Sequence, residues 1–189
     1  MEEGIVSEVV VSMNVALDGV IEAPEMWSFQ FWSDELSASA HEELVGSDAL
    51  LLGRLNYEAF AAFWPIATNE PGIADRMNSL PKYVASTTLE EPLGWSNSTL
   101  IRGDVAEEVA KLKQEPGKNI LVFSADLART LTEHDLVDEY RIRLAPAVAG
   151  SGKRLFAEGG DAKTMRLVGT RTFATGVVGL TYRSAESDQ

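Results

Sequence analysis

The pattern of hydrophobic and polar positions changes period repeatedly along the chain. Residues 9–16 are mostly apolar on both alternating faces, which indicates a strand inside a sheet. In places between the strands, apolar residues recur every three or four positions, as on the buried face of a helix. Strands that alternate with helices favour parallel pairing, with helices on both faces of the sheet. Further strands are predicted at 49–52, 82–86, 99–102, 119–123 and 139–147.

Local sequence signals the starts and ends of the helices. Ser33 is a typical capping residue, and Asp34 and Glu35 would lie in the first turn, at the positive end of the helix dipole. Pro65 ends a helix, and the composition that follows it predicts a loop over residues 65–80. Helices are expected after Ser33, after Gly53, after residues 103–104 and over residues 124–133.

The last two predicted strands form a hairpin. They cover residues 166–175 and 177–183 and are joined at Gly176. The chain has no internal repeat and no linker-like segment, so we expect one domain over residues 1–189, with its core at about 8–183. The predicted fold class is α/β, with three α/β/α layers, a mixed, mostly parallel eight-stranded sheet and a C-terminal antiparallel hairpin.

Composition narrows the classes of function. The formal net charge of −13 repels nucleic acid and anionic lipid, so we expect neither as a partner. The chain has no cysteine, and His41 and His134 fit no metal-ligand or catalytic-triad spacing, so no metal site is expected. No apolar run approaches the roughly 20 residues of a membrane helix, and no secretory leader is recognisable. We therefore expect a cytoplasmic protein.

The most informative local pattern is a buried strand that runs directly into a helix at Gly53 and Arg54. The free N–H groups of such a helix start favour an anion, and Arg54 adds a permanent charge. Turns of this kind also occur without a ligand, so both interpretations stay open. Ser86, Arg102 and Ser124 also follow predicted parallel strands, whose carboxyl ends form the usual binding edge. Together these positions indicate a nucleotide-like ligand.

A glycine-rich loop follows the sixth predicted strand, at residues 150–154. It is not a phosphate loop for ATP, because Ala147 and Arg154 stand where Gly and Ser or Thr are required. It is not a Rossmann fingerprint either, because Leu155 replaces the third glycine. The loop is either a plain turn or a place where backbone closely approaches a ligand.

Three carboxylates are candidates for proton handling. Asp18, followed by Gly19, is typical of a tight turn, and Asp34 and Glu35 are typical of a helix start. The alternative is that one of them faces the pocket, and Asp34 is then the candidate catalytic residue. The aromatic residues of segment 27–32 either line the core or pocket, or stack on a flat ring.

Five motifs occur along the chain in a characteristic order. They are MNVALDGVI at 13–21, LLGRLNYE at 51–58, LPKYVAS at 80–86, LVDE at 136–139 and PAVAGSGKRLF at 146–156. The first three resemble the dihydrofolate reductase superfamily. The last two resemble the reductase domain of bacterial riboflavin biosynthesis and its stand-alone relatives. The similarity runs from about residue 8 to about residue 183.

This resemblance implies NADPH as the cofactor, hydride transfer to a small heterocyclic or conjugated substrate, and a homodimer. It implies that Asn14 and Ile21 border the nicotinamide, and that Arg102 lies near the adenine. The 2′-phosphate would lie near Ser86 and Thr87. The other phosphates would lie at two helix starts, one formed by Gly53, Arg54 and Leu55 and the other by Ser124, Ala125, Asp126 and Leu127.

The chain departs from these families at two places. A glycine pair usually follows the fifth strand, whereas this chain has Ser124 and Ala125, and their side chains together with Asp126 would weaken cofactor binding. Dihydrofolate reductases also carry an acid in the helix before the Gly-Arg strand. Counting back from Gly53, that place falls nearer Ser37 than Asp34, which argues against dihydrofolate as the substrate.

Three functions are compatible with these observations. The leading hypothesis is an NADPH-dependent oxidoreductase with a small substrate. The second is a non-enzymatic binding protein that has lost productive cofactor binding. The third is a pyrimidine reductase of the riboflavin pathway, which would reduce a ribosylamino-pyrimidine.

Overall fold

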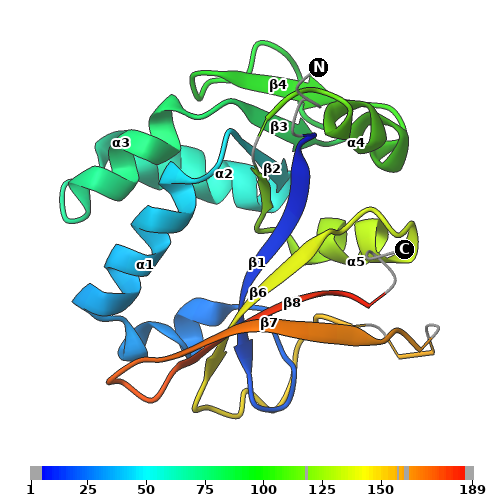
Figure 1. Ribbon diagram of the computed structural model, residues 1–189. Helices are drawn as coiled ribbons and strands as arrows, with labels where there is room; N and C mark the ends of the chain where they lie inside the picture. Colours follow the sequence, from blue (N-terminus) through cyan, green and yellow to red (C-terminus); the bar gives the residue numbers. More distant parts are fainter. Residues whose placement is uncertain (1–5, 118, 157, 160–161, 186–189) are drawn as a thin grey trace.

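The computed structural model describes residues 6–117, 119–156, 158–159 and 162–185, which form one sheet with helices on both faces (Figure 1). The strand order is β4-β3-β2-β5-β1-β6-β8-β7. Pairing is parallel from β4 to β6, whereas β8 runs antiparallel to both β6 and β7. The strands are β1 (Glu8–Ala16), β2 (Ala49–Gly53), β3 (Lys82–Ala85), β4 (Ser98–Ile101), β5 (Asn119–Val122), β6 (Glu139–Ala145), β7 (Met165–Thr172) and β8 (Val178–Ser184).

The helices pack in two groups because strand residues alternate in direction. Leu50 and Leu52 of β2 pack on one side with residues of α1, α2 and α3, whereas Leu51 packs on the other with residues of α4 and α5 (Figure 1). The predicted three-layer α/β/α fold is therefore confirmed. The helices are α1 (Asp34–Val45), α2 (Arg54–Phe63), α3 (Pro71–Ser79), α4 (Val105–Lys113) and α5 (Ala125–Glu133), with 3-10 turns η1 (Pro24–Met26), η2 (Phe29–Phe31) and η3 (Trp64–Ile66).

The predicted loop over residues 65–80 is wrong, because most of this segment forms η3 and α3. Pro71 occupies the first turn of α3, where its missing N–H and fixed φ suit a helix start. Ile73 and Met77 are buried against α1 and the sheet. Pro71 therefore initiates a helix inside the segment that was predicted as a loop.

A buried lysine lies at the start of β3. Lys82 is 1% exposed, and its ammonium donates to the carbonyl oxygens of Asn78, Leu80 and Ser96 at 2.7–3.1 Å. The ammonium also lies 4.3 Å from the centre of a Trp95 ring. Burial lowers the pKa of Lys82 to about 8.

The hairpin between β7 and β8 forms as predicted, with Gly176 in the left-handed region at φ 88°. Within the described residues, no helix is both long enough and apolar enough to cross a bilayer.

Candidate functional site

Two helix starts meet at the carboxyl ends of β2 and β5, which are paired in parallel. The Gly53 N–H donates to Ser124 Oγ at 2.7 Å, and Ser124 Oγ donates to Asn56 Oδ1 at 2.8 Å. The Ser124 hydroxyl is therefore engaged, and neither α2 nor α5 has a side-chain cap. The uncapped first turns of two adjacent helices concentrate partial positive charge at one place, which suits an anion.

Gly53 leaves room for the Ser124 hydroxyl. Its φ of −80° is accessible to any residue, but a Cβ atom at this position would lie 3.3 Å from Ser124 Oγ. That spacing is tighter than most Cβ contacts, so a larger residue would require the Ser124 hydroxyl to shift by a few tenths of an ångström.

Charged side chains flank both helix starts. Arg54 forms an exposed ion pair with Glu58 at 3.3 Å, one turn along α2. Asp126, which the sequence analysis takes as an obstacle to a phosphate, forms an ion pair with Lys153, whose Nζ lies 2.9 Å and 3.0 Å from the two carboxylate oxygens. Sequence reasoning missed this partner, which comes from the glycine-rich loop.

The glycine-rich loop folds over the turn that follows β1. The Asp18 carboxylate accepts hydrogen bonds from the N–H of Gly150 at 2.7 Å and of Ala149 at 3.3 Å. The bond from Gly150 is the main reason that the pKa of Asp18 lies below its ordinary value. The Ile21 N–H donates to the Lys153 carbonyl oxygen at 2.8 Å. Asp18 thus forms the predicted turn and also holds the loop beside Ile21.

Asn14 and Ile21, predicted to border a nicotinamide, lie at the end of β1 and just after it. Ile21 is buried, and Asn14 is partly buried. The Asn14 Nδ2 donates to Ser28 Oγ at 3.5 Å, so Asn14 contacts the aromatic segment 27–32. Trp27 is buried, and its Nε1 donates to the Glu22 carbonyl oxygen. The structure therefore brings this end of β1 and the aromatic segment together.

The residues predicted near the 2′-phosphate and the adenine follow β3 and β4. The Ser86 Oγ accepts from the N–H groups of Thr88 and Leu89 at 3.1 Å and 3.0 Å, which orders the turn after β3. Thr87 and Arg102 are exposed. The carboxyl ends of these two neighbouring strands are therefore followed by the hydroxyl groups of Ser86 and Thr87 and by the guanidinium of Arg102.

Among the candidate acids, Asp34 is exposed at the first position of α1. Glu35 accepts a hydrogen bond from the Ala174 N–H at 3.0 Å. Glu70, which the sequence analysis did not single out, accepts from Ser37 Oγ at 2.5 Å and from Trp32 Nε1 at 3.3 Å. A carboxylate therefore does lie beside Ser37, but it comes from the start of α3.

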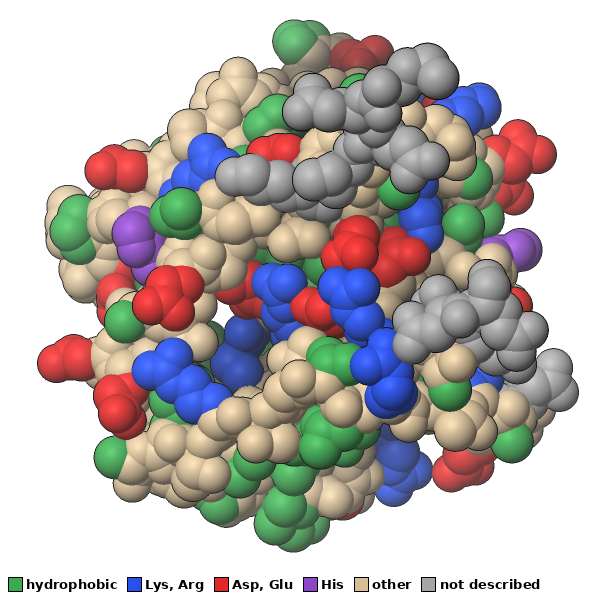
Figure 2. All heavy atoms as spheres, in the orientation of Figure 1, with side chains coloured by type: hydrophobic (Ala, Val, Ile, Leu, Met, Phe, Trp, Pro, Cys, Tyr) green, Lys and Arg blue, Asp and Glu red, His purple; other side chains and the backbone are tan. Residues whose placement is uncertain are grey.

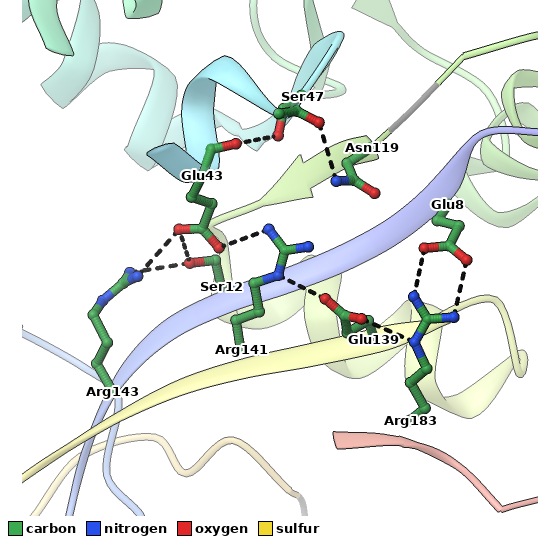
Figure 3. A network of polar contacts seen from close by, with 10 residues as sticks. Glu8, Ser12, Glu43, Ser47, Asn119, Glu139, Arg141, Arg143 and Arg183 are labelled. Carbon is green, nitrogen blue, oxygen red and sulfur yellow. Dashed lines mark hydrogen bonds and ion pairs between the residues drawn. The ribbon is translucent and has the colours of Figure 1, made fainter. Parts of the chain in front are cut away.

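A network of ion pairs connects α1 with β6 (Figure 3). Glu43 of α1, whose side chain is 9% exposed, pairs with Arg141 at 3.4 Å and with Arg143 at 3.1 Å. Arg141 also pairs with Glu139, which continues the network to β8 through Arg183. The alternation of arginines with apolar residues in β6 was visible in the sequence, but it did not identify Glu43 as their partner.

Beside this network, a cavity of about 410 Å³ lies between α1 and strands β6, β7 and β8. Gly179, which stands between Arg143 and Arg171 in register, is one of its lining residues. Figure 2 shows basic and acidic side chains gathered beside a hollow on this face of the molecule. The charged residues that line the cavity are Glu42, Glu43, Arg141, Arg143 and Arg171.

Comparison with known proteins agrees with this fold. The chain is 31% identical over 180 residues to the uncharacterized protein YyaP of Bacillus subtilis, covering 92% of this chain and 93% of that protein. A putative riboflavin biosynthesis protein from Shewanella sp. PV-4 superposes with a TM-score of 0.72 at 20% identity, covering 95% and 99% of the two chains.

Dihydrofolate reductase from Enterococcus faecalis superposes with a TM-score of 0.61 at 13% identity, covering 95% of this chain and 97% of that one. The fold is therefore the dihydrofolate-reductase-like fold that the motifs imply. The sequence profile of the RibD C-terminal domain matches residues 7–179. The chain belongs to the RibD C-terminal domain family.

Proposed function

We propose that this protein is an oxidoreductase that uses NADPH to reduce a small heterocyclic or conjugated substrate. The observation that carries the proposal is the pair of uncapped helix starts joined by the bond from Gly53 to Ser124. A dinucleotide has several phosphate charges, and this corner of the sheet offers the matching donors. When bound, NADPH supplies a hydride from its dihydronicotinamide ring.

The phosphates would bind across the starts of α2 and α5. Arg54 lies at the first position of α2, half exposed, and is able to turn from Glu58 to a phosphate. Lys153 offsets the charge of Asp126 at the first turn of α5. A preference for NADPH over NADH would come from Ser86, Thr87 and Arg102.

The nicotinamide would lie beside Asn14 and Ile21, against segment 27–32. There the protein would hold the nicotinamide ring and the substrate ring at contact distance. Buried side chains such as Trp27 would exclude water. The proton that accompanies the hydride would come from water or from Asp34. Such a site suits a flat, conjugated substrate.

One observation favours a second function, a binding protein without productive cofactor use. The Ser124 side chain is buried at the turn before α5, and Ala125 follows it, so backbone cannot approach a phosphate as closely as it could at glycine. In that case NADPH would bind poorly, and replacing Ser124 and Ala125 with glycine would strengthen binding.

The test is a titration of the purified protein with NADPH and with NADH, followed by nicotinamide fluorescence. Micromolar affinity with a preference for NADPH would support the reductase and justify a screen of pterin, pyrimidine and enone substrates. No binding up to millimolar NADPH would contradict the reductase and favour the second function.

A further inference from the structure

The guanidinium of Arg143 is held in one orientation by three partners. Its Nε donates to Asn14 Oδ1 at 2.9 Å, its Nη2 donates to Ser12 Oγ at 3.0 Å, and its Nη1 donates to Glu43 Oε2 at 3.1 Å. The side chain is 18% exposed. Figure 3 shows Arg143 and Ser12, from the adjacent strands β6 and β1, pointing to the Glu43 carboxylate. Arg143 is therefore fixed by β1, β6 and α1 together.

This arrangement determines which end of the Asn14 amide faces Arg143. A guanidinium carries N–H donors only and stays charged at every pH at which the protein is folded. The Asn14 side chain must therefore present its oxygen to Arg143, and its NH₂ group points to the opposite side. A flipped amide would place N–H groups against N–H groups.

The NH₂ group of Asn14 is consequently aimed toward Ser28 and the aromatic segment. Its contact with Ser28 Oγ is 3.5 Å long, and no other acceptor among the described residues bonds to Nδ2. The positively charged guanidinium that donates to the amide oxygen polarises the amide and makes its N–H a better donor. The end of β1 thus offers an oriented donor to a ligand.

We infer that Arg143 is a positioning residue that turns the Asn14 N–H toward the carboxamide oxygen of the nicotinamide ring. The inference rests on the proposed function, because the carbonyl acceptor is that of the cofactor. It goes beyond that function because it assigns recognition of the nicotinamide ring to Asn14 of β1. It also assigns the orientation of Asn14 to Arg143 of β6.

The test uses two ligands and three variants of the full chain. NADPH carries the nicotinamide ring, whereas 2′-phospho-ADP-ribose carries the same phosphates without it, so the ratio of the two affinities isolates the ring. Asn14→Asp keeps an acceptor for Arg143 but removes the donor. Arg143→Met removes the orienting group. Arg141→Met is the matched control, because Arg141 contacts Glu43 and Glu139 but not Asn14.

We expect Asn14→Asp to bind NADPH roughly 10- to 100-fold more weakly, with unchanged affinity for 2′-phospho-ADP-ribose and no loss of melting temperature. Arg143→Met should change the affinity ratio in the same direction. Arg141→Met should lower the melting temperature but leave the ratio as in the wild type.

Three results would overturn the inference while leaving the proposed function intact. They are an unchanged ratio in Asn14→Asp, an unchanged ratio in Arg143→Met, and equal affinity of the wild type for the two ligands. If the wild type bound neither ligand, the proposed function itself would fail, and the inference with it.

Discussion

The two halves of the sheet are stabilised by different interactions. In the half that contains β2 and β5, Leu50, Leu51 and Leu52 are fully buried, between helices on both sides. In the half that contains β8, every residue of β8 is only partly buried, and most residues of β7 are exposed. Arg141, Arg143 and Arg183 of that half are instead held by carboxylates. Apolar layers thus support the helix starts of the candidate site, whereas ion pairs fix the strand that adjoins Asn14.

The largest expected effect comes from removing an apolar side chain in the first half. Leu51→Ala should lower the free energy of unfolding by about 4 kcal/mol, because it leaves a cavity among fully buried neighbours. Leu167→Ala in β7, where the side chain is 48% exposed, should cost less than about 1 kcal/mol. Urea unfolding measures both changes. Equal losses would contradict the contrast between the halves.

The next largest effect is expected in the half of the sheet that contains β8. Glu43→Gln should lower the free energy of unfolding by about 3 kcal/mol, because it leaves Arg141 and Arg143 without their shared carboxylate at a nearly buried position. The control is Glu108→Gln, which breaks an exposed pair with Lys111 within α4 and should have no measurable effect. If the two variants were equally stable, the network would not support this half.

Lys82 gives a prediction that depends on pH. The pKa of Lys82 is lowered from 10.5 to about 8 in the folded state, so the unfolded state binds more protons between these values. Burial of the charged ammonium therefore lowers the free energy of unfolding below pH 8, and this loss becomes smaller as the pH rises above 8. Relative to Lys82→Met, the wild type should gain about 2 kcal/mol between pH 7 and pH 9.5.

Urea unfolding at several pH values measures this difference. Lys82→Met also removes a donor from three carbonyl oxygens, which shifts its stability by an amount that does not vary with pH. A constant difference between the two proteins across this range would contradict the lowered pKa.

The smallest expected effect concerns the ion pair at the start of α5 and follows from the proposed function. Lys153→Met should weaken NADPH binding by roughly fivefold, because Asp126 then repels the phosphates without a partner. Asp126→Asn should strengthen binding by a similar factor. In the double variant, the loss caused by Lys153→Met should disappear if Lys153 acts only through Asp126. Persistence of the full loss would mean that Lys153 contacts the phosphate itself.

Much of the fold was predictable because its signals are local. The apolar run at residues 49–52 and the Gly-Arg pair after it predict β2, α2 and the corner between them. The start of α1 was predicted from Ser33, whose Oγ accepts from the Leu36 N–H at 3.3 Å. The helix at Pro71 was missed because a single proline is compatible with both the end and the start of a helix.

The contacts that complete the candidate site were not predictable in this way, because they join residues far apart in the sequence. Asp126 and Lys153 are 27 positions apart, and Asn14 and Arg143 are 129 positions apart. No periodicity connects such residues, so neither the partner of Asp126 nor that of Asn14 was predicted. Only the sheet order, which places β1 between β5 and β6, brings these partners together.

The bond between Gly53 and Ser124 has a consequence for how the protein folds. It joins residues 71 positions apart, so the two helix starts become neighbours only after β2 and β5 have paired. A chain in which only one of these strand–helix units has formed has half of the anion-binding corner. A ligand that contacts both helix starts would bind only the state in which the sheet is complete. It would therefore stabilise the whole molecule against unfolding rather than a single helical turn.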